Sequence, residues 1–241
     1  MFELLKAQKA LKNGDREKAE SYFKKILKKS NVDALIYYGY EMIREGRAQE
    51  ALSLFDVTLL PLYEKKRKEL EEKITPKNKG SITQKINAQE IKVYSNYAIA
   101  LWQCGNLQKA IEVTERLFEK YKNTVLYGNL TFYYILSDDK EKALSLAKEA
   151  YDFAPDDASI LDNLGYSLFE NGQLEESEKI YQKLMEKNPT FPDAYNNYAT
   201  VLIALGKKQE AKQILQKCLN CNFTALTLAK REDVEKIYKE L

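Results

Sequence analysis

Histidine is absent from this 241-residue sequence, and several other residue types are scarce. Without histidine the chain cannot use a histidine general base, form a Ser-His-Asp triad or bind zinc through imidazole. The three cysteines, Cys104, Cys218 and Cys221, are too few for a disulfide-rich secreted scaffold. Only nine glycines and five prolines accompany 17 tyrosines, and so few turn-forming residues favour long helices over many short strands.

Long apolar runs and an excess of charge of one sign are also missing. The longest largely apolar stretch, residues 198–205, is far shorter than the ~20 residues that span a bilayer. The N-terminal segment carries Lys or Arg every few residues and lacks the apolar run of a signal peptide. The 38 basic residues nearly balance the 36 acidic ones, so no large field attracts nucleic acid or a membrane. We therefore expect a soluble, cytoplasmic protein without a membrane partner, and nucleic acid is disfavoured as a ligand.

What the sequence does contain is an internal repeat of about 34 residues. Gly172 and Gly206 lie 34 residues apart, as do Pro155 and Pro189. The recurring turn residues are Gly14, Gly46, Gly105, Asp138, Gly172 and Gly206. Each unit is predicted to form two amphipathic helices joined by a short turn, in which glycine adopts the left-handed conformation. Because one helix pair cannot bury both of its apolar stripes, neighbouring units must stack.

This pattern resembles the tetratricopeptide repeat, whose motif distributes aromatic residues, Leu-Gly, Tyr, Ala and Pro over 34 residues. The fifth unit carries Leu164-Gly165, Tyr181 and Pro189. The resemblance implies an all-α fold, a right-handed α-solenoid of about six helix-turn-helix units. We assign two units to residues 1–65, four units to residues 91–223, and a C-terminal capping helix to residues 224–241.

Residues 66–90 interrupt the repeat and contain seven Lys or Arg against four Glu. We expect the preceding helix to continue to Thr75-Pro76, and a second helix, capped by Ser81 or Thr83, to run on into the third unit. The result would be a projecting helical hairpin. Two interpretations of this insertion stay open, a solvated extension and an arm that docks a partner.

A column of asparagines occurs once per unit in four consecutive units: Asn96, Asn129, Asn163 and Asn197. In the family that the chain resembles, this column lines a concave groove and binds the backbone of an extended peptide. An amide suits that role because it offers both a donor and an acceptor. Aromatic and apolar side chains follow at helical spacing: Ile99, Trp102, Phe132, Tyr166 and Phe169. The alternatives are that the asparagines serve the scaffold and that the apolar residues belong to the core.

Other residue patterns favour neither an enzyme nor a cofactor. Cys218 and Cys221 have no second cysteine pair with which to complete a metal site, and no phosphate-binding glycine motif occurs. The positions at which some members of the resembled family clamp a terminal carboxylate hold no cation here: Ser95, Gly128, Asp162 and Asn196. We therefore predict a non-enzymatic module that binds a peptide or helix of a partner protein, without metal or cofactor and without a chaperone-tail clamp. A structural, self-assembling solenoid subunit is the alternative, and a nucleic-acid-binding accessory protein is a weaker one.

Overall fold

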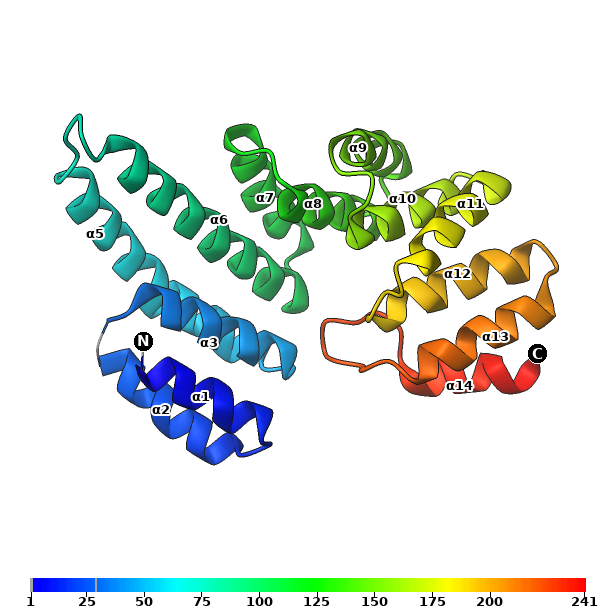
Figure 1. Cartoon of the computed structure of the whole chain (residues 1–241), viewed down its shortest axis with the longest axis horizontal. Coiled ribbons are helices and arrows are strands. Elements are labelled where there is room, and N and C mark those ends of the chain that lie inside the picture. The colour runs from blue at the N-terminus through cyan, green and yellow to red at the C-terminus, as the bar shows by residue number, and fades with distance from the viewer. Residues whose placement is uncertain (1, 29) are drawn as a thin grey trace. The chain divides into compact units, whose positions relative to one another are not determined.

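The computed structural model describes residues 2–28 and 30–241, with the side chains of all of these except Phe2 and Leu27. Met1 and Lys29, which fall in the first predicted repeat segment, lie outside the described residues. Across the described part of the chain every regular element is a helix and no strand occurs (Figure 1). The all-α prediction is therefore confirmed. The chain divides into two compact units, Met1–Asn106 and Leu107–Leu241.

The first compact unit consists of three helix pairs, and the last pair contains one long helix. Its elements are α1 (Phe2–Lys12), α2 (Arg16–Lys28), α3 (Val32–Arg44), α4 (Ala48–Leu54), the π-helical turn η1 (Phe55–Leu59), α5 (Leu60–Glu71) and α6 (Lys79–Gln103). Helix α1 packs on α2, and α2 packs on α3. The 25-residue α6 then packs on α3, α4 and α5. Phe55, Leu59 and Tyr63 are buried in this arrangement.

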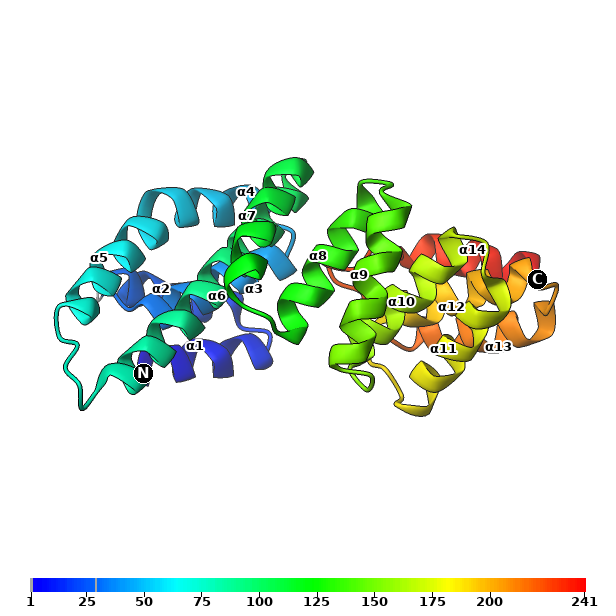
Figure 2. The ribbon, with the colours of Figure 1, turned by 90° about the horizontal axis from the view of Figure 1, so that it is seen from above.

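Helices α5 and α6 form a hairpin closed by Asn78 (Figures 1 and 2). The Oδ1 of Asn78 accepts a hydrogen bond from the Thr75 amide at 2.6 Å, and its Nδ2 donates to the Lys73 carbonyl at 2.9 Å. Because this side chain closes the turn, α6 begins directly after it at Lys79. Ser81 and Thr83 consequently lie inside the helix, and their predicted capping role is wrong.

The second compact unit is a succession of helix pairs. Its elements are α7 (Leu107–Lys120), α8 (Thr124–Leu136), α9 (Lys140–Phe153), α10 (Ala158–Glu170), α11 (Leu174–Glu186), α12 (Pro192–Ala204), α13 (Lys208–Leu219) and α14 (Arg231–Glu240). The helices of the pairs α8/α9, α10/α11 and α12/α13 pack together. Between pairs, α9 packs on α10 and α11 packs on α12. Helix α14 packs on α13 (Figure 1) and buries Val234 in the same core as Leu202 and Leu215.

The turns between paired helices have the backbone conformation that the glycine spacing predicts. Gly172 has φ of 75° and Gly206 has φ of 77°, both in the left-handed region. The Gly172 amide donates to the Phe169 carbonyl at 2.9 Å, and the Gln173 amide donates to the Leu168 carbonyl at 2.9 Å. These two bonds satisfy carbonyls that the end of α10 leaves free, which ends the helix at the turn. Asp138 takes the same conformation, with φ of 59°, in the turn that lacks glycine.

Among the described helices, none combines the length and apolar composition needed to cross a membrane.

Candidate functional site

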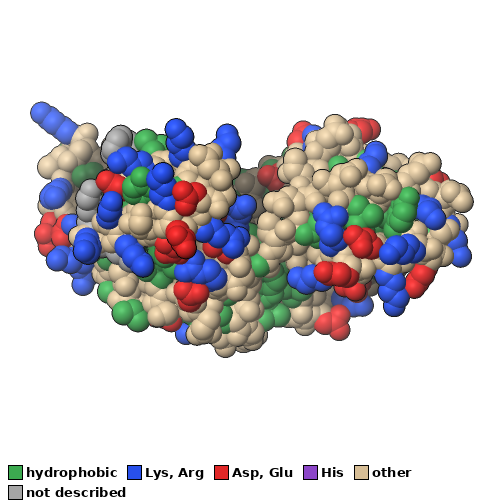
Figure 3. Space-filling view, turned by 90° about the horizontal axis from the view of Figure 1, so that it is seen from below, with side chains coloured by type: hydrophobic (Ala, Val, Ile, Leu, Met, Phe, Trp, Pro, Cys, Tyr) green, Lys and Arg blue, Asp and Glu red, His purple; other side chains and the backbone are tan. Residues whose placement is uncertain are grey.

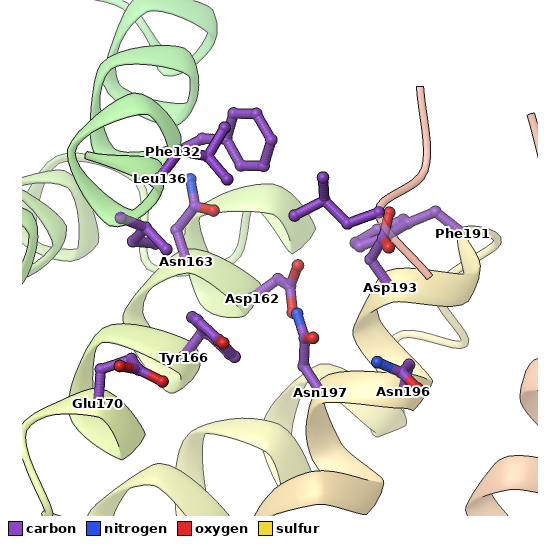
Figure 4. A pocket seen from close by; sticks show the side chains of 12 residues that line it. Phe132, Leu136, Asp162, Asn163, Tyr166, Glu170, Phe191, Asp193, Asn196 and Asn197 are labelled. Atoms are coloured by element: carbon purple, nitrogen blue, oxygen red, sulfur yellow. The ribbon is translucent and has the colours of Figure 1, made fainter. Parts of the chain in front are cut away.

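The second compact unit contains a pocket of about 470 Å³. Its wall is formed by α8, α10 and α12, together with Phe191 directly before α12 and Leu228 in the loop before α14 (Figure 4). Four residues that the sequence singles out line it: Phe132, Asn163, Tyr166 and Asn197. Tertiary structure therefore brings part of the predicted groove together in one place.

Helix periodicity and the repeat explain why these four residues converge. Asn163 and Asn197 lie 34 residues apart and occupy corresponding positions on α10 and α12, which contact each other. Tyr166 follows Asn163 by three residues, which places both side chains on one face of α10. Phe132 lies on α8, which packs on α10. Helices α8, α10 and α12 thus each contribute side chains to the same pocket.

Three amides of the asparagine column donate hydrogen bonds to the first helix of the preceding repeat. Asn163 Nδ2 donates to the Gly128 carbonyl of α8 at 2.8 Å, and Asn197 Nδ2 donates to Asp162 Oδ1 of α10 at 3.2 Å. In the first compact unit Asn96 Nδ2 donates to the Ile36 carbonyl at 3.4 Å. These contacts use the donor side of each amide for the repeat itself. Among the described residues no donor reaches Asn163 Oδ1, so this acceptor is available at the pocket wall.

Asp162 is the centre of a buried polar network at the pocket. The Tyr181 hydroxyl lies 3.1 Å from Asp162 Oδ1 and 3.2 Å from the Asp162 carbonyl, and Asn197 contacts the same carboxylate (Figure 4). Burial raises the pKa of Asp162 to about 7, because hydrogen bonds from Asn197 and Tyr181 offset only part of the cost of removing the charge from water. The sequence identified Asp162 only as a position at which a carboxylate-clamping cation is missing. Its place in this network could not be predicted, because Tyr181 and Asn197 are 19 and 35 residues away in the sequence.

The position of Tyr181 depends on the glycine of the Leu-Gly motif. A Cβ atom added at Gly165 would lie 2.7 Å from Tyr181 Cε2 and 2.9 Å from Cζ. Glycine therefore allows the ring on α11 to contact the backbone of α10 closely, as the paired motif positions require. The ring also stacks on Tyr198, with centroids 5.5 Å apart and an interplanar angle of 15°. This packing fixes the hydroxyl that supports Asp162.

The remaining predicted site residues do not line this pocket. Asn96, Ile99 and Trp102 lie on α6 in the first compact unit, and all three are half-buried. Phe169 lies on α10 beside Tyr166, with ring centroids 5.9 Å apart, but packs against the hydrophobic core. Asn129 on α8 has a buried Nδ2 that finds no hydrogen-bond partner among the described residues.

The pocket side chains that the sequence did not point to are mostly acidic or aromatic. Glu170, Asp193 and Phe191 line the pocket together with Asp162. Glu170 lies one helical turn beyond Tyr166, so helix spacing alone was a signal that could have identified it. Phe191 and Asp193 border the start of α12, and no repeat position pointed to them.

These repeated helix pairs place the chain in the class of α-helical repeat proteins, the α-solenoids. Family models described as tetratricopeptide repeat match residues 4–65 and 168–224, and the chain belongs to the tetratricopeptide repeat family. Proteins of this family are in general interaction scaffolds for protein or peptide partners and are typically non-catalytic. No curated protein sequence matches the chain.

Several solved structures share the fold. A thermophilic tetratricopeptide repeat protein of Thermus thermophilus is 18% identical, with 87% of this chain and 98% of that chain covered and a TM-score of 0.62. A tetratricopeptide repeat protein of Parabacteroides merdae is 15% identical, with 98% and 96% covered and a TM-score of 0.55. MamA of Desulfovibrio magneticus is 16% identical, with 78% and 93% covered and a TM-score of 0.51. Because the sequence identities are this low, the comparison shows a shared fold and nothing more.

Proposed function

We propose that the protein is a non-enzymatic interaction module that binds a peptide or helix of a partner protein. The binding surface is the asparagine- and aromatic-lined groove, which includes the pocket between α8, α10 and α12. The observation that carries this proposal is the convergence of Phe132, Asn163, Tyr166 and Asn197 on one pocket of about 470 Å³. Such a pocket combines apolar contact area with a few placed polar groups, as ligand sites generally do.

Each group has a defined role in this proposal. The half-buried rings of Phe132 and Tyr166 contact apolar side chains of the ligand, since aromatic residues are favoured anchors at interfaces. Asn163 Oδ1 accepts a hydrogen bond from a ligand backbone amide, independently of the ligand sequence. Because Asn163 Nδ2 is already bonded to the Gly128 carbonyl at 2.8 Å, the amide orientation is set before binding. This preorganisation reduces the conformational entropy that binding would otherwise cost.

Peptide selection on the full chain tests this proposal, because a random library offers ligands of every side-chain chemistry. Peptides enriched from a random dodecapeptide display library would be synthesised, and their Kd values measured by isothermal titration calorimetry. We expect the double variant Asn163→Ala/Phe132→Ala to bind about 30-fold more weakly, because truncating two interface anchors costs about 2 kcal/mol or more.

The matched control is Asn220→Ala/Phe153→Ala. It removes the same two side-chain types from the same compact unit, at exposed positions that do not line the pocket. Unchanged affinity of the pocket variant, or an equal loss in the control, would show that the peptides bind elsewhere. Far-UV circular dichroism of both variants checks that the helices are intact.

A further inference from the structure

The charged residues of the pocket wall have one sign. Asp162, Glu170 and Asp193 line it, and within the described part of the chain no Lys or Arg does. This contrasts with the chain as a whole, in which 38 basic residues stand against 36 acidic ones. Figure 3 shows the usual pattern on one face, where basic and acidic side chains are interspersed. The acidic character is therefore local to the pocket.

The partners of these carboxylates leave them only partly neutralised. Asp193 Oδ1 accepts a hydrogen bond from the Ala229 amide at 2.7 Å, and burial raises the pKa of this carboxyl although Lys230 acts against the shift. Glu170 pairs with Lys140 at 3.0 Å, outside the pocket wall. Asp162 has only uncharged hydrogen-bond partners, Tyr181 and Asn197. A ligand cation in the pocket would thus gain from carboxylates that protein cations do not fully compensate.

The carboxylates are spread along the pocket instead of converging on one point. Figure 4 shows Glu170 and Asp193 on opposite sides of Asp162. Among the described residues no three acidic or cysteine side chains come together in a group that could hold a metal ion. Spread carboxylates suit a guanidinium group, whose N–H donors point in several directions, better than a metal ion, whose ligands must converge on one point. A pocket of about 470 Å³ has room for a long side chain.

Aromatic rings lie beside the acidic groups in the same wall. Phe132, Tyr166 and Phe191 all line the pocket. The face of an aromatic ring attracts a cation, and it also packs against the methylene stem of a long basic side chain. A guanidinium group combines this stacking with hydrogen bonds to carboxylates more effectively than an ammonium group does.

We propose that this pocket binds a positively charged side chain, arginine before lysine, within the peptide segment of the partner protein. This inference rests on the proposed function and specifies the chemistry of its ligand: a basic residue with apolar neighbours. The apolar neighbours contact the outer part of the aromatic wall, while the basic head group lies among Asp162, Glu170 and Asp193.

The peptides selected on the full chain provide the test. We expect arginine and lysine to be enriched at one position, and replacing that arginine by citrulline to weaken binding about tenfold or more. Citrulline keeps the shape and removes the charge, so the protein itself is unchanged in this comparison. Lysine at the same position should give an intermediate Kd. A loss of charge-assisted contacts of this size is typical of partly buried ion pairs at interfaces.

Variants of the pocket then connect the effect to its carboxylates. Glu170→Gln/Asp193→Asn should bind the citrulline and arginine peptides with a clearly smaller difference in Kd than the wild type does, because two of the three carboxylates of the pocket wall are then uncharged. The control Glu175→Gln/Glu176→Gln removes two exposed charges from the same unit, away from the pocket, and should keep the tenfold difference. Asn at position 193 retains an oxygen that accepts the Ala229 hydrogen bond.

The outcomes separate this inference from the proposed function. Selected peptides that depend on Asn163 and Phe132 but show no basic preference, or that bind equally with citrulline, would overturn the inference and leave the proposed function standing. Equal arginine-to-citrulline ratios in the pocket variant and the wild type would also overturn it. Peptides whose affinity is insensitive to Asn163 and Phe132 would contradict the proposed function, and the inference with it.

Discussion

Replacing Gly165 by alanine tests the packing that supports the pocket. The added Cβ would lie 2.7, 2.9 and 3.0 Å from three ring atoms of Tyr181, well inside ordinary van der Waals contact. The ring cannot move away freely, because Tyr181 is fully buried, stacks on Tyr198 and hydrogen-bonds Asp162. Either α10 and α11 must separate or the network at Asp162 must be disturbed.

The magnitude follows from two opposing effects. Overpacking of a closely packed core costs about 1–3 kcal/mol, and three simultaneous close contacts indicate the upper end of that range. Alanine has a higher helix propensity than glycine, and this difference stabilises the variant by about 1 kcal/mol. We therefore expect Gly165→Ala to lower the free energy of unfolding by about 2 kcal/mol.

Urea unfolding followed by far-UV circular dichroism measures this change. Gly128→Ala is the matched control, since outside its own helix its Cβ would meet, among the described residues, only Ser159 Oγ, at 3.4 Å, and it should be neutral or stabilising by up to about 1 kcal/mol. In a Tyr181→Leu background the cost of Gly165→Ala should largely disappear, as expected for two residues in contact. If the Gly165→Ala variant had the same free energy of unfolding as the Gly128→Ala variant, with an unchanged dependence on urea, the close contact between α10 and α11 would be refuted.

Two further predictions concern the turn and the buried carboxyl. Gly172→Ala should lower the free energy of unfolding by about 1–2 kcal/mol through backbone strain alone, because φ is 75° and, beyond its two chain neighbours, no atom of the described residues lies within 4 Å of the added carbon; an unchanged urea midpoint would contradict this. Asp162 has a pKa raised by burial from 3.8 to about 7, so its contribution to stability is complete below about pH 4 and is lost as the pH rises through about 7. The wild type should therefore lose stability relative to Asp162→Asn between about pH 4 and about pH 7, and parallel urea midpoints of the two proteins across that range would contradict it.

The repeat could be read from the sequence because its signals are local. A glycine at a helix end encodes a left-handed residue directly, and the positive φ values of Gly14, Gly46 and Gly105 agree with the spacing. The pairing of Gly165 with Tyr181 was likewise visible as a motif. What it meant physically, a ring in contact with the neighbouring backbone, needed coordinates.

The prediction was wrong where several side chains close together in the sequence could each have capped the same helix. Ser81 and Thr83 are both acceptable helix caps, but Asn78 closes the turn first through two hydrogen bonds. The π-helical turn at Phe55–Leu59 gave no sequence signal, because nothing local distinguishes it from the α-helix on either side.

The sequence by itself determined the helical repeat, its turns and its family, since these depend on residue spacing and on backbone preferences that act over a few residues. Only the tertiary structure decided which side chains share a pocket. Asn163 and Asn197 donate hydrogen bonds to the first helix of the preceding repeat. Phe169 packs into the core, whereas Phe132 and Tyr166 line the pocket. Asp193 of α12 lines the same pocket as Asp162 and Glu170 of α10 because contact between these two helices brings residues that are distant in the sequence into one wall. The physical reason is that packing between helices, unlike a turn, depends on all of the side chains at the contact at once.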